Sequence, residues 1–271
     1  MRSGGLRVES PLGDIHLPQV NVTDTPGNVG RADFVLLCVK LWDTEDAIRA
    51  IAPIVGPGTA ILSFQNGVQK DDVLRSAFGH AAVMSGIAQI GSSIDRPGVI
   101  KHIGTMQRLV FGEHDGTRSA RAEALLHACI SGGIDASIGD DMRRIVWEKF
   151  VFLAGLSGTT TTMRATIGPI RSHPRTRAFL LDLMRETVAV GRALGVALPA
   201  DYADQRLTFV DGLPETMTSS MHHDLNGGGR LEVSWLSGGV VQLGEAAGVP
   251  TPMNRAVWDV LALHEAGNPR D

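Results

Sequence analysis

Apolar residues in the first half of the chain occur either in continuous runs or at helical spacing. Continuous runs such as residues 32–39 and 59–64 predict strands that are covered on both faces of a sheet. Segments whose apolar positions recur every three or four residues predict helices. By these criteria strands are predicted at 32–39, 59–64, 82–84, 99–103 and 107–112, and helices at 44–54, 71–78 and 118–130. This alternation predicts an α/β domain with a largely parallel sheet.

The chain begins with a different pattern. Apolar and polar residues alternate between positions 5 and 21 around a turn at Pro11-Leu12-Gly13-Asp14, which predicts short antiparallel strands. Further on, Cys38 lies inside the apolar run 32–39, where we expect a buried free thiol.

From about Asp141 onwards the pattern is helical. Helices are predicted at 141–156, 175–194, 216–225, 232–247 and 253–264. Gly195 and Pro199 follow the second of these and are typical of the end of a helix. The sequence therefore predicts an α/β domain over residues 1–136 and an all-α domain over residues 137–271.

Composition narrows the class of protein. The 271 residues are 43% hydrophobic and 20% charged, with a formal net charge of −4, which is typical of a globular chain. No basic run suggests a nucleic-acid partner, and no apolar stretch approaches the roughly 18 residues of a membrane span. The start lacks an apolar signal core, and with only two cysteines we expect a cytoplasmic protein without a structural disulfide.

Two short segments carry polar residues at positions that could contribute to a ligand-binding site. Asn66-Gly67 directly follows the predicted strand 59–64, and the carboxyl ends of parallel strands are where open sheets bind ligands. Lys149 lies inside a strongly apolar helix, between Val146 and Phe150. A metal site is not expected, because the adjacent residues of His222-His223-Asp224 point about 100° apart on a helix.

Five motifs in this order resemble those of the ketopantoate reductase (2-dehydropantoate 2-reductase) family across essentially the whole chain. They are Cys38-Val39-Lys40, Phe64-Gln65-Asn66-Gly67, Trp147-Glu148-Lys149, Ser219-Ser220-Met221 and Arg230-Leu231-Glu232. The resemblance implies a Rossmann domain followed by a helical domain, with the active site between them. It also implies that NADPH reduces the 2-keto group of 2-dehydropantoate to a hydroxyl, as in pantothenate biosynthesis.

The resemblance assigns roles to single residues. Lys149 corresponds to the catalytic lysine, and Glu232 to the active-site glutamate, which would contact substrate and cofactor. Asn66 corresponds to the asparagine where cofactor and substrate meet, and Lys40 to a cofactor-binding lysine. Ser220 corresponds to a substrate-binding serine. A lysine ammonium beside a ketone stabilises the developing negative charge and can donate the proton, so these residue types suit the chemistry.

Each residue also has an ordinary interpretation. Lys149 and Lys40 could be solvated surface lysines, and Asn66 could simply form a turn. Glu232 could be an acid in the first turn of a helix, and Ser220 a helical hydroxyl without a role.

The chain departs from the family pattern at its start. It contains no strand followed by Gly-x-Gly-x-x-Gly and a helix, and Gly5-Leu6-Arg7-Val8-Glu9-Ser10 resembles the segment downstream of that unit. We therefore expect an incomplete Rossmann-type parallel sheet, and either a longer natural chain or a true truncation that binds NADPH poorly. The former is the interpretation that we favour.

A second departure concerns the substrate. Family members that reduce 2-dehydropantoate usually carry asparagines one and two turns after the catalytic lysine, where this chain has Leu153 and Ser157. Ser157 can still contact a substrate, whereas Leu153 offers no hydrogen bond, so a different keto acid stays open as the substrate. Ser234 and Ser237 likewise stand where the family more often has aspartate and asparagine.

Two other functions stay open beside a reductase. One is a catalytically inactive homologue that acts by association, which the absent glycine loop suggests. The other is a β-hydroxyacid-type dehydrogenase, which also pairs a Rossmann domain with a helical one. The long apolar helices are compatible with a homodimer.

Overall fold

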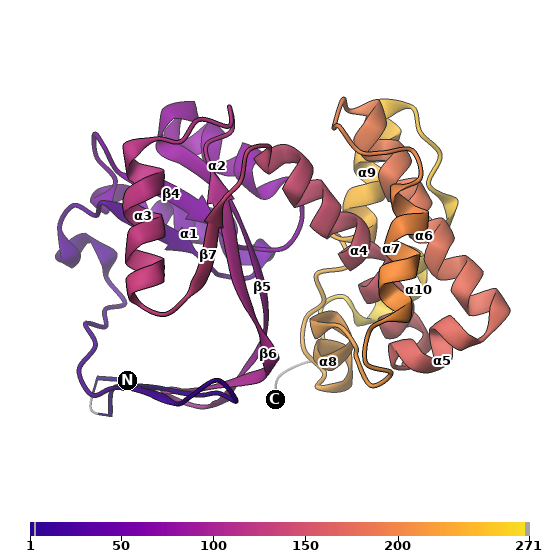
Figure 1. Cartoon of the computed structure of the whole chain (residues 1–271), viewed down its shortest axis with the longest axis horizontal. Helices are drawn as coiled ribbons and strands as arrows, with labels where there is room; N and C mark the ends of the chain where they lie inside the picture. The colour runs from indigo at the N-terminus through magenta and orange to yellow at the C-terminus, as the bar shows by residue number, and fades with distance from the viewer. Residues whose placement is uncertain (3, 269–271) are drawn as a thin grey trace. The chain divides into compact units, whose positions relative to one another are not determined.

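The computed structural model describes residues 1–2 and 4–268 (Figure 1). These fall into two compact units. The first comprises Met1–Val39, Asp43–Gln65 and Asp71–Met142, and the second comprises Lys40–Trp42, Asn66–Lys70 and Arg143–Asp271. The first unit contains the sheet, and the second is helical. The two short segments near residues 40 and 66 therefore group with the helices, although their neighbours in sequence belong to the sheet.

The first unit is built on a mixed sheet. Its strands are β1 (Leu6–Glu9), β2 (Ile15–Leu17), β3 (Phe34–Leu37), β4 (Ala60–Ser63), β5 (Val83–Arg96), β6 (Val99–Gly112) and β7 (Asp135–Ile138). The order is β2-β1-β6-β5-β4-β3, with β7 beside β6. β3, β4 and β5 run parallel, as do β1 and β7 with β6, whereas β1–β2 and β5–β6 are antiparallel. The predicted α/β class and N-terminal hairpin are confirmed.

The predicted strand lengths were wrong for the antiparallel pair. Residues 82–84, 99–103 and 107–112 were expected to form three short segments, but β5 and β6 are continuous strands of 14 residues each. The far half of β5, from Gly91 to Arg96, is mostly exposed. Its residues therefore lack the buried apolar alternation by which strands are recognised. Strand β7 was also missed.

Helices cover both faces of the sheet. They are α1 (Thr44–Ile51), α2 (Lys70–Phe78) and α3 (Ala120–Ser131), with single turns at Pro26–Val29, Leu41–Asp43, Ala52–Ile54 and His80–Ala82. Val35 and Ile61 pack with Ile51 of α1 and Leu74 of α2. Leu62, the next residue of β4, packs on the opposite face in the cluster that includes Leu125 and Cys129 of α3. Successive side chains of β4 therefore pack into two separate hydrophobic cores, one on each face of the sheet.

Strand β3 corrects two expectations. All four residues of β4 are buried, as predicted for a strand covered on both faces. β3, however, is the edge strand, and Leu36 is 47% exposed. Cys38 follows the end of β3 and is exposed rather than buried.

The second unit is formed by helices of varied length. They are α4 (Met142–Met163), α5 (Ile167–Ser172), α6 (Pro174–Ala193), α7 (Tyr202–Asp211), α8 (Ser220–Asn226), α9 (Ser237–Ala247) and α10 (Pro252–Leu261), followed by a turn at Ala262–His264. The helices predicted from 216 and 232 begin later, at Ser220 and Ser237. α5 and α7 were not predicted.

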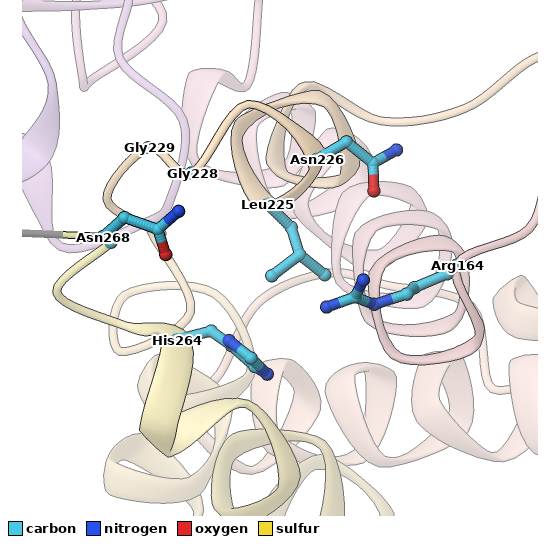
Figure 2. A pocket seen from close by; sticks show the side chains of 8 residues that line it. Arg164, Leu225, Asn226, Gly228, Gly229, His264 and Asn268 are labelled. Atoms are coloured by element: carbon cyan, nitrogen blue, oxygen red, sulfur yellow. The ribbon is translucent and has the colours of Figure 1, made fainter.

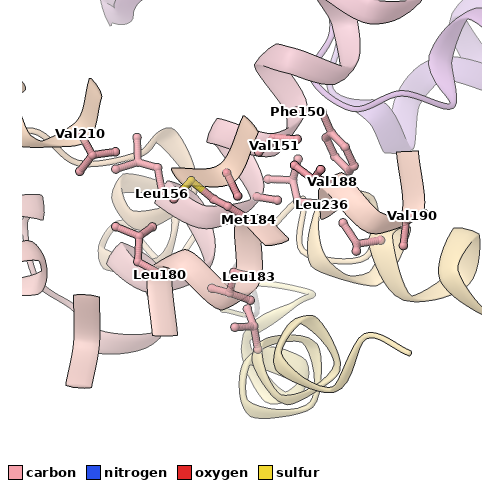
Figure 3. Close-up of a cluster of buried hydrophobic side chains, with 14 of the residues drawn as sticks. Phe150, Val151, Leu156, Leu180, Leu183, Met184, Val188, Val190, Val210 and Leu236 are labelled. Carbon is pink, nitrogen blue, oxygen red and sulfur yellow. The ribbon is translucent and has the colours of Figure 1, made fainter. Parts of the chain in front are cut away.

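One hydrophobic core holds the helices together (Figure 3). Phe150 and Val151 of α4 belong to the same buried cluster as Leu183 and Met184 of α6, and Leu236 joins it from the turn before α9. Burial of side chains of this size stabilises the fold by roughly 1.5–3 kcal/mol each. Among the described residues, no helix is both long and apolar enough to cross a membrane.

Candidate active site

Lys149 and Asn66 lie together within the helical unit. On either side of Lys149 along α4, the side chains of Trp147 and Phe150 are buried and contact each other edge to face. This packing fixes the rotation of the helix and leaves Lys149 half-buried. Its Nζ donates a hydrogen bond to Asn66 Oδ1 over 2.9 Å.

The segment that carries Asn66 depends on a glycine. Gly67 has a φ of +91°, which favours glycine over other residues, and a Cβ there would lie 3.4 Å from Leu41 Cδ1. The segment ends at Lys70, the first residue of α2, whose side chain is only 1% exposed. A second buried lysine therefore accompanies Lys149 in the same unit.

This environment changes the acidity of Lys149. Burial, with a further contribution from the Lys70 ammonium, lowers the pKa of Lys149 to about 8, although the Glu232 carboxylate works in the opposite direction. A lysine with a pKa near the working pH is a better proton donor than an ordinary lysine.

Glu232 is buried outside any helix. It is 5% exposed and lies between Leu231 and Val233, whose side chains are fully buried. Its backbone carbonyl accepts hydrogen bonds from the amides of Trp235 and Leu236, which form the turn before α9. The alternative interpretation of Glu232 as a first-turn acid is therefore wrong, because α9 begins only at Ser237.

Lys40 lies between two carboxylates. Its Nζ is 2.8 Å from Asp224 Oδ2 and 3.5 Å from Glu232 Oε2, and the other oxygen of Glu232 accepts the amide of Leu41 over 3.2 Å. Burial alone would lower the pKa of Lys40, but the Glu232 and Asp224 carboxylates raise it above its ordinary value. Lys40 is consequently a stable cation that also orients Glu232.

Aromatic rings flank this ion pair. The Trp42 and Trp235 ring centroids are 6.1 Å apart, and the Arg230 guanidinium lies 4.7 Å from the Trp42 centroid and 5.8 Å from that of Trp235. Lys40 Nζ is 5.6 Å from the Trp42 centroid. These cation–π contacts hold the Lys40–Trp42 segment against the turn that carries Glu232.

The two predicted serines are placed differently. Ser157 is buried on α4, two turns after Lys149. Ser220 is the first residue of α8 and is exposed. Ser219 before it caps the helix, accepting the amide of His222, and its hydroxyl lies 2.9 Å from Thr160 Oγ1 of α4. This contact ties the start of α8 to the helix that carries Lys149.

The ring of His222 is held by structural contacts. His222 is buried between Thr218 and Asn226, which contact its two ring nitrogens. Burial and the neighbouring His223 lower the pKa of His222. In the part of the chain that the structure describes, no group of three or more His, Cys, Asp or Glu residues is arranged to hold a metal ion.

A pocket of about 270 Å³ lies within the helical unit (Figure 2). Arg164 and His264 point into it from opposite sides, and Leu225, Asn226, Gly228, Gly229, Gly267 and Asn268 complete its lining. None of these residues was predicted as a site residue. The Gly229 amide donates a hydrogen bond to the Asp224 carbonyl over 2.7 Å, so the pocket lies next to the residue that pairs with Lys40.

The structure adds two residues that sequence reasoning did not identify. Asp224 was considered only as a metal ligand, yet it is the nearest carboxylate to Lys40. Lys70 belongs to none of the recognised motifs. The sequence could have pointed to it only through its position four residues after Asn66. Together the cluster offers a lysine poised to donate a proton, an amide side chain beside it, and a buried carboxylate held by a second lysine.

Sequence comparison identifies relatives over nearly the whole chain. Residues 1–116 match the family model "Ketopantoate reductase PanE/ApbA", and residues 141–265 match "Ketopantoate reductase PanE/ApbA C terminal". A 2-dehydropantoate 2-reductase from Halobacterium salinarum is 30% identical over 263 residues, which cover 97% of this chain and 86% of that protein.

Solved structures agree with this grouping. The 2-dehydropantoate 2-reductase from Geobacter metallireducens superimposes with a TM-score of 0.89 at 28% identity, covering 97% of this chain and 87% of the other. A PanE/ApbA family ketopantoate reductase from Ralstonia eutropha gives a TM-score of 0.87 at 30% identity, covering 97% and 86%. The match extends over both halves of the sequence, and the chain therefore belongs to the ketopantoate reductase family of nicotinamide-dependent oxidoreductases.

Proposed function

We propose that this protein reduces 2-dehydropantoate, or a closely related 2-keto acid, to the 2-hydroxy acid with NADPH. The observation that carries the proposal is the pairing of Lys149 Nζ with Asn66 Oδ1, together with the lowered pKa of that lysine. The relatives named as 2-dehydropantoate 2-reductases support the same activity.

Lys149 serves as the general acid. When bound, NADPH would supply a hydride for the keto carbon, which would leave negative charge on the carbonyl oxygen of the substrate. A lysine ammonium beside that oxygen stabilises the charge and transfers a proton to it. Asn66 Oδ1 holds the ammonium in position, which leaves the amide nitrogen of Asn66 free to donate to substrate or cofactor.

Other residues orient the substrate. Glu232, fixed by Lys40 and the Leu41 amide, accepts a hydrogen bond from a polar group of the substrate or cofactor. Ser157 and Ser220 supply hydroxyl groups that can bind the substrate.

The residues present fit the reacting end of NADPH. Asn66 and Glu232 offer hydrogen bonds suited to the ribose next to the nicotinamide, and Lys40 offers a cation for a phosphate. By contrast, α1 and α2, which follow β3 and β4, each carry two acids in their first turn, and these repel a pyrophosphate. The fit therefore rests on the site around Lys149.

Replacement of Lys149 tests the assignment. Lys149→Met should lower kcat by about a hundredfold or more while the circular dichroism spectrum is unchanged. Lys101→Met, at an exposed lysine of β6, is the matched control and should retain full activity. A Lys149→Met protein with near-normal turnover would show that the assignment is wrong.

A titration of the whole chain with NADPH separates the reductase from a homologue that acts by association. Saturable binding that depends on Lys40 supports the reductase, whereas no binding together with no turnover favours association. Sedimentation of the same preparation would test the predicted homodimer.

A further inference from the structure

Leu153 occupies an unusual position on α4. It lies one turn after Lys149 on the same face of the helix and is half-buried. Its neighbours Phe152 and Ala154 belong to the packing of the helical core. Among the described residues, Leu153 does not belong to that core cluster. The helix face that carries Lys149 therefore also carries an apolar side chain that does not pack in the core.

The spacing along α4 determines which part of a substrate each residue can meet. At about 1.5 Å per residue, Leu153 lies about 6 Å along the axis from Lys149, and Ser157 about 12 Å. In 2-dehydropantoate the terminal hydroxyl is three bonds from the keto carbon. When the keto oxygen is beside the Lys149 ammonium, the short carbon chain is therefore nearer to Leu153 than to Ser157.

An apolar neighbour distinguishes a hydroxyl from a methyl group. Leu153 can neither donate nor accept a hydrogen bond, so a hydroxyl buried against it loses its bonds to water without replacement. A methyl group in the same place gains from burial instead. The helix face therefore favours a hydrocarbon chain over a hydroxylated one.

We propose that the substrates of this protein are 2-keto acids whose carbon chain carries no hydroxyl group, and that Leu153 is the residue that determines this specificity. The inference rests on the proposed function, since it takes Lys149 as the proton donor to the keto oxygen. A terminal hydroxyl on the substrate would gain no hydrogen bond from Leu153.

The reaction is otherwise unchanged. A hydride from NADPH forms the new C–H bond at the keto carbon, and the π electron pair of the carbonyl moves to oxygen. Lys149 gives its proton to that oxygen and is reprotonated from water. NADPH is oxidised to NADP⁺, and the 2-keto acid is reduced to the 2-hydroxy acid.

Two substrates that differ by one hydroxyl test the proposal. 3,3-Dimethyl-2-oxobutanoate has the carbon skeleton of 2-dehydropantoate but lacks its terminal hydroxyl. For the intact chain we expect kcat/KM to be about tenfold higher for the compound without the hydroxyl. Leu153→Asn, which introduces a hydrogen-bonding side chain, should reverse the preference.

Controls and contrary outcomes are defined by the same assay. Leu263→Asn, at a leucine that is 93% exposed, should leave the substrate ratio unchanged. A wild-type preference for 2-dehydropantoate, or an unchanged ratio in a folded Leu153→Asn protein, would overturn the inference alone. If Leu153→Asn does not fold, the inference is tested by the ratio of kcat/KM for the two substrates in the wild type and in a Leu153→Ser variant. If the wild type reduces neither compound, the proposed function fails as well.

Discussion

Lys149 Nζ donates a hydrogen bond to Asn66 Oδ1 over 2.9 Å, although 83 positions separate the two residues in the chain. The turn at Asn66 can form without a lysine beside it, and the helix around Lys149 can form without an amide side chain beside it. The pairing joins a residue of α4 to the segment that follows β4, and it is the contact on which the proposed proton transfer depends.

Asn66→Leu should remove the partner that positions the Lys149 ammonium. Hydrogen bonds to charged groups contribute about 1.5–3 kcal/mol, so we expect kcat to fall by roughly ten- to a hundredfold. Steady-state kinetics measure the change. Asn28→Leu, at an exposed asparagine of the sheet unit, is the control. Unaltered kcat in Asn66→Leu would show that the pairing does not serve the reaction.

The pH dependence of turnover should reflect Lys149. A general acid must be protonated, and with a pKa of about 8 Lys149 is protonated below pH 8 and neutral above it. The rate should accordingly decline as the pH rises through about 8. Measurement of kcat between pH 6 and 10 checks this, and a rate that stays constant across that range would argue against Lys149 as the acid.

Lys70→Met should shift that decline. The Lys70 ammonium helps to lower the pKa of Lys149, so its removal should raise this pKa and move the loss of activity to higher pH. Lys70→Arg keeps the charge and should restore the original profile. Because Lys70 is buried, circular dichroism of both variants must accompany the kinetics. Identical profiles in Lys70→Met and wild type would contradict the role of Lys70.

Asp224→Asn should strengthen NADPH binding. Asp224 neutralises Lys40 from 2.8 Å, and its charge competes with any phosphate that Lys40 could bind. Loss of one partly exposed carboxylate changes such an interaction by about 0.2–1 kcal/mol, so Kd should decrease up to about fivefold. Asp211→Asn, which breaks a similar pair with Arg177, is the control. Weaker NADPH binding in Asp224→Asn would exclude the competition.

The sequence predicted those parts of the fold that follow from local patterning. β4 and the helices α3, α4 and α6 have strong apolar runs or helical spacing, and each was located to within a few residues except the far end of α4. The exposed half of β5 has no buried face along which a pattern could appear. Its strand arises from pairing with β6, which is a tertiary contact.

The residues of the candidate site likewise fall into those that sequence motifs indicate and those that only the structure reveals. Lys149, Asn66 and Glu232 stand in short motifs that are weak alone and become recognisable only as a set in the family's order. The partnership of Asp224 with Lys40 joins residues 184 positions apart, and no spacing rule reveals it. Burial of Lys70 was equally hidden, because an isolated lysine at the start of a helix is normally exposed.

Gly191→Ala should destabilise the helical unit beside the site. Gly191 lies in α6, where a Cβ would be 2.7 Å from the Trp147 ring and 2.9 Å from Leu198 Cδ1. Overpacking of this kind costs about 1–3 kcal/mol, which exceeds the gain of up to about 1 kcal/mol in helix propensity. The free energy of unfolding, measured by urea denaturation, should therefore decrease. Gly212→Ala meets no atom closer than 3.5 Å and should have little effect. Because Trp147 precedes Lys149 by two residues, the Gly191→Ala protein should also lose turnover, whereas Gly212→Ala should not. Equal free energies of unfolding for the two variants would show that α4 can shift to accommodate the added methyl group.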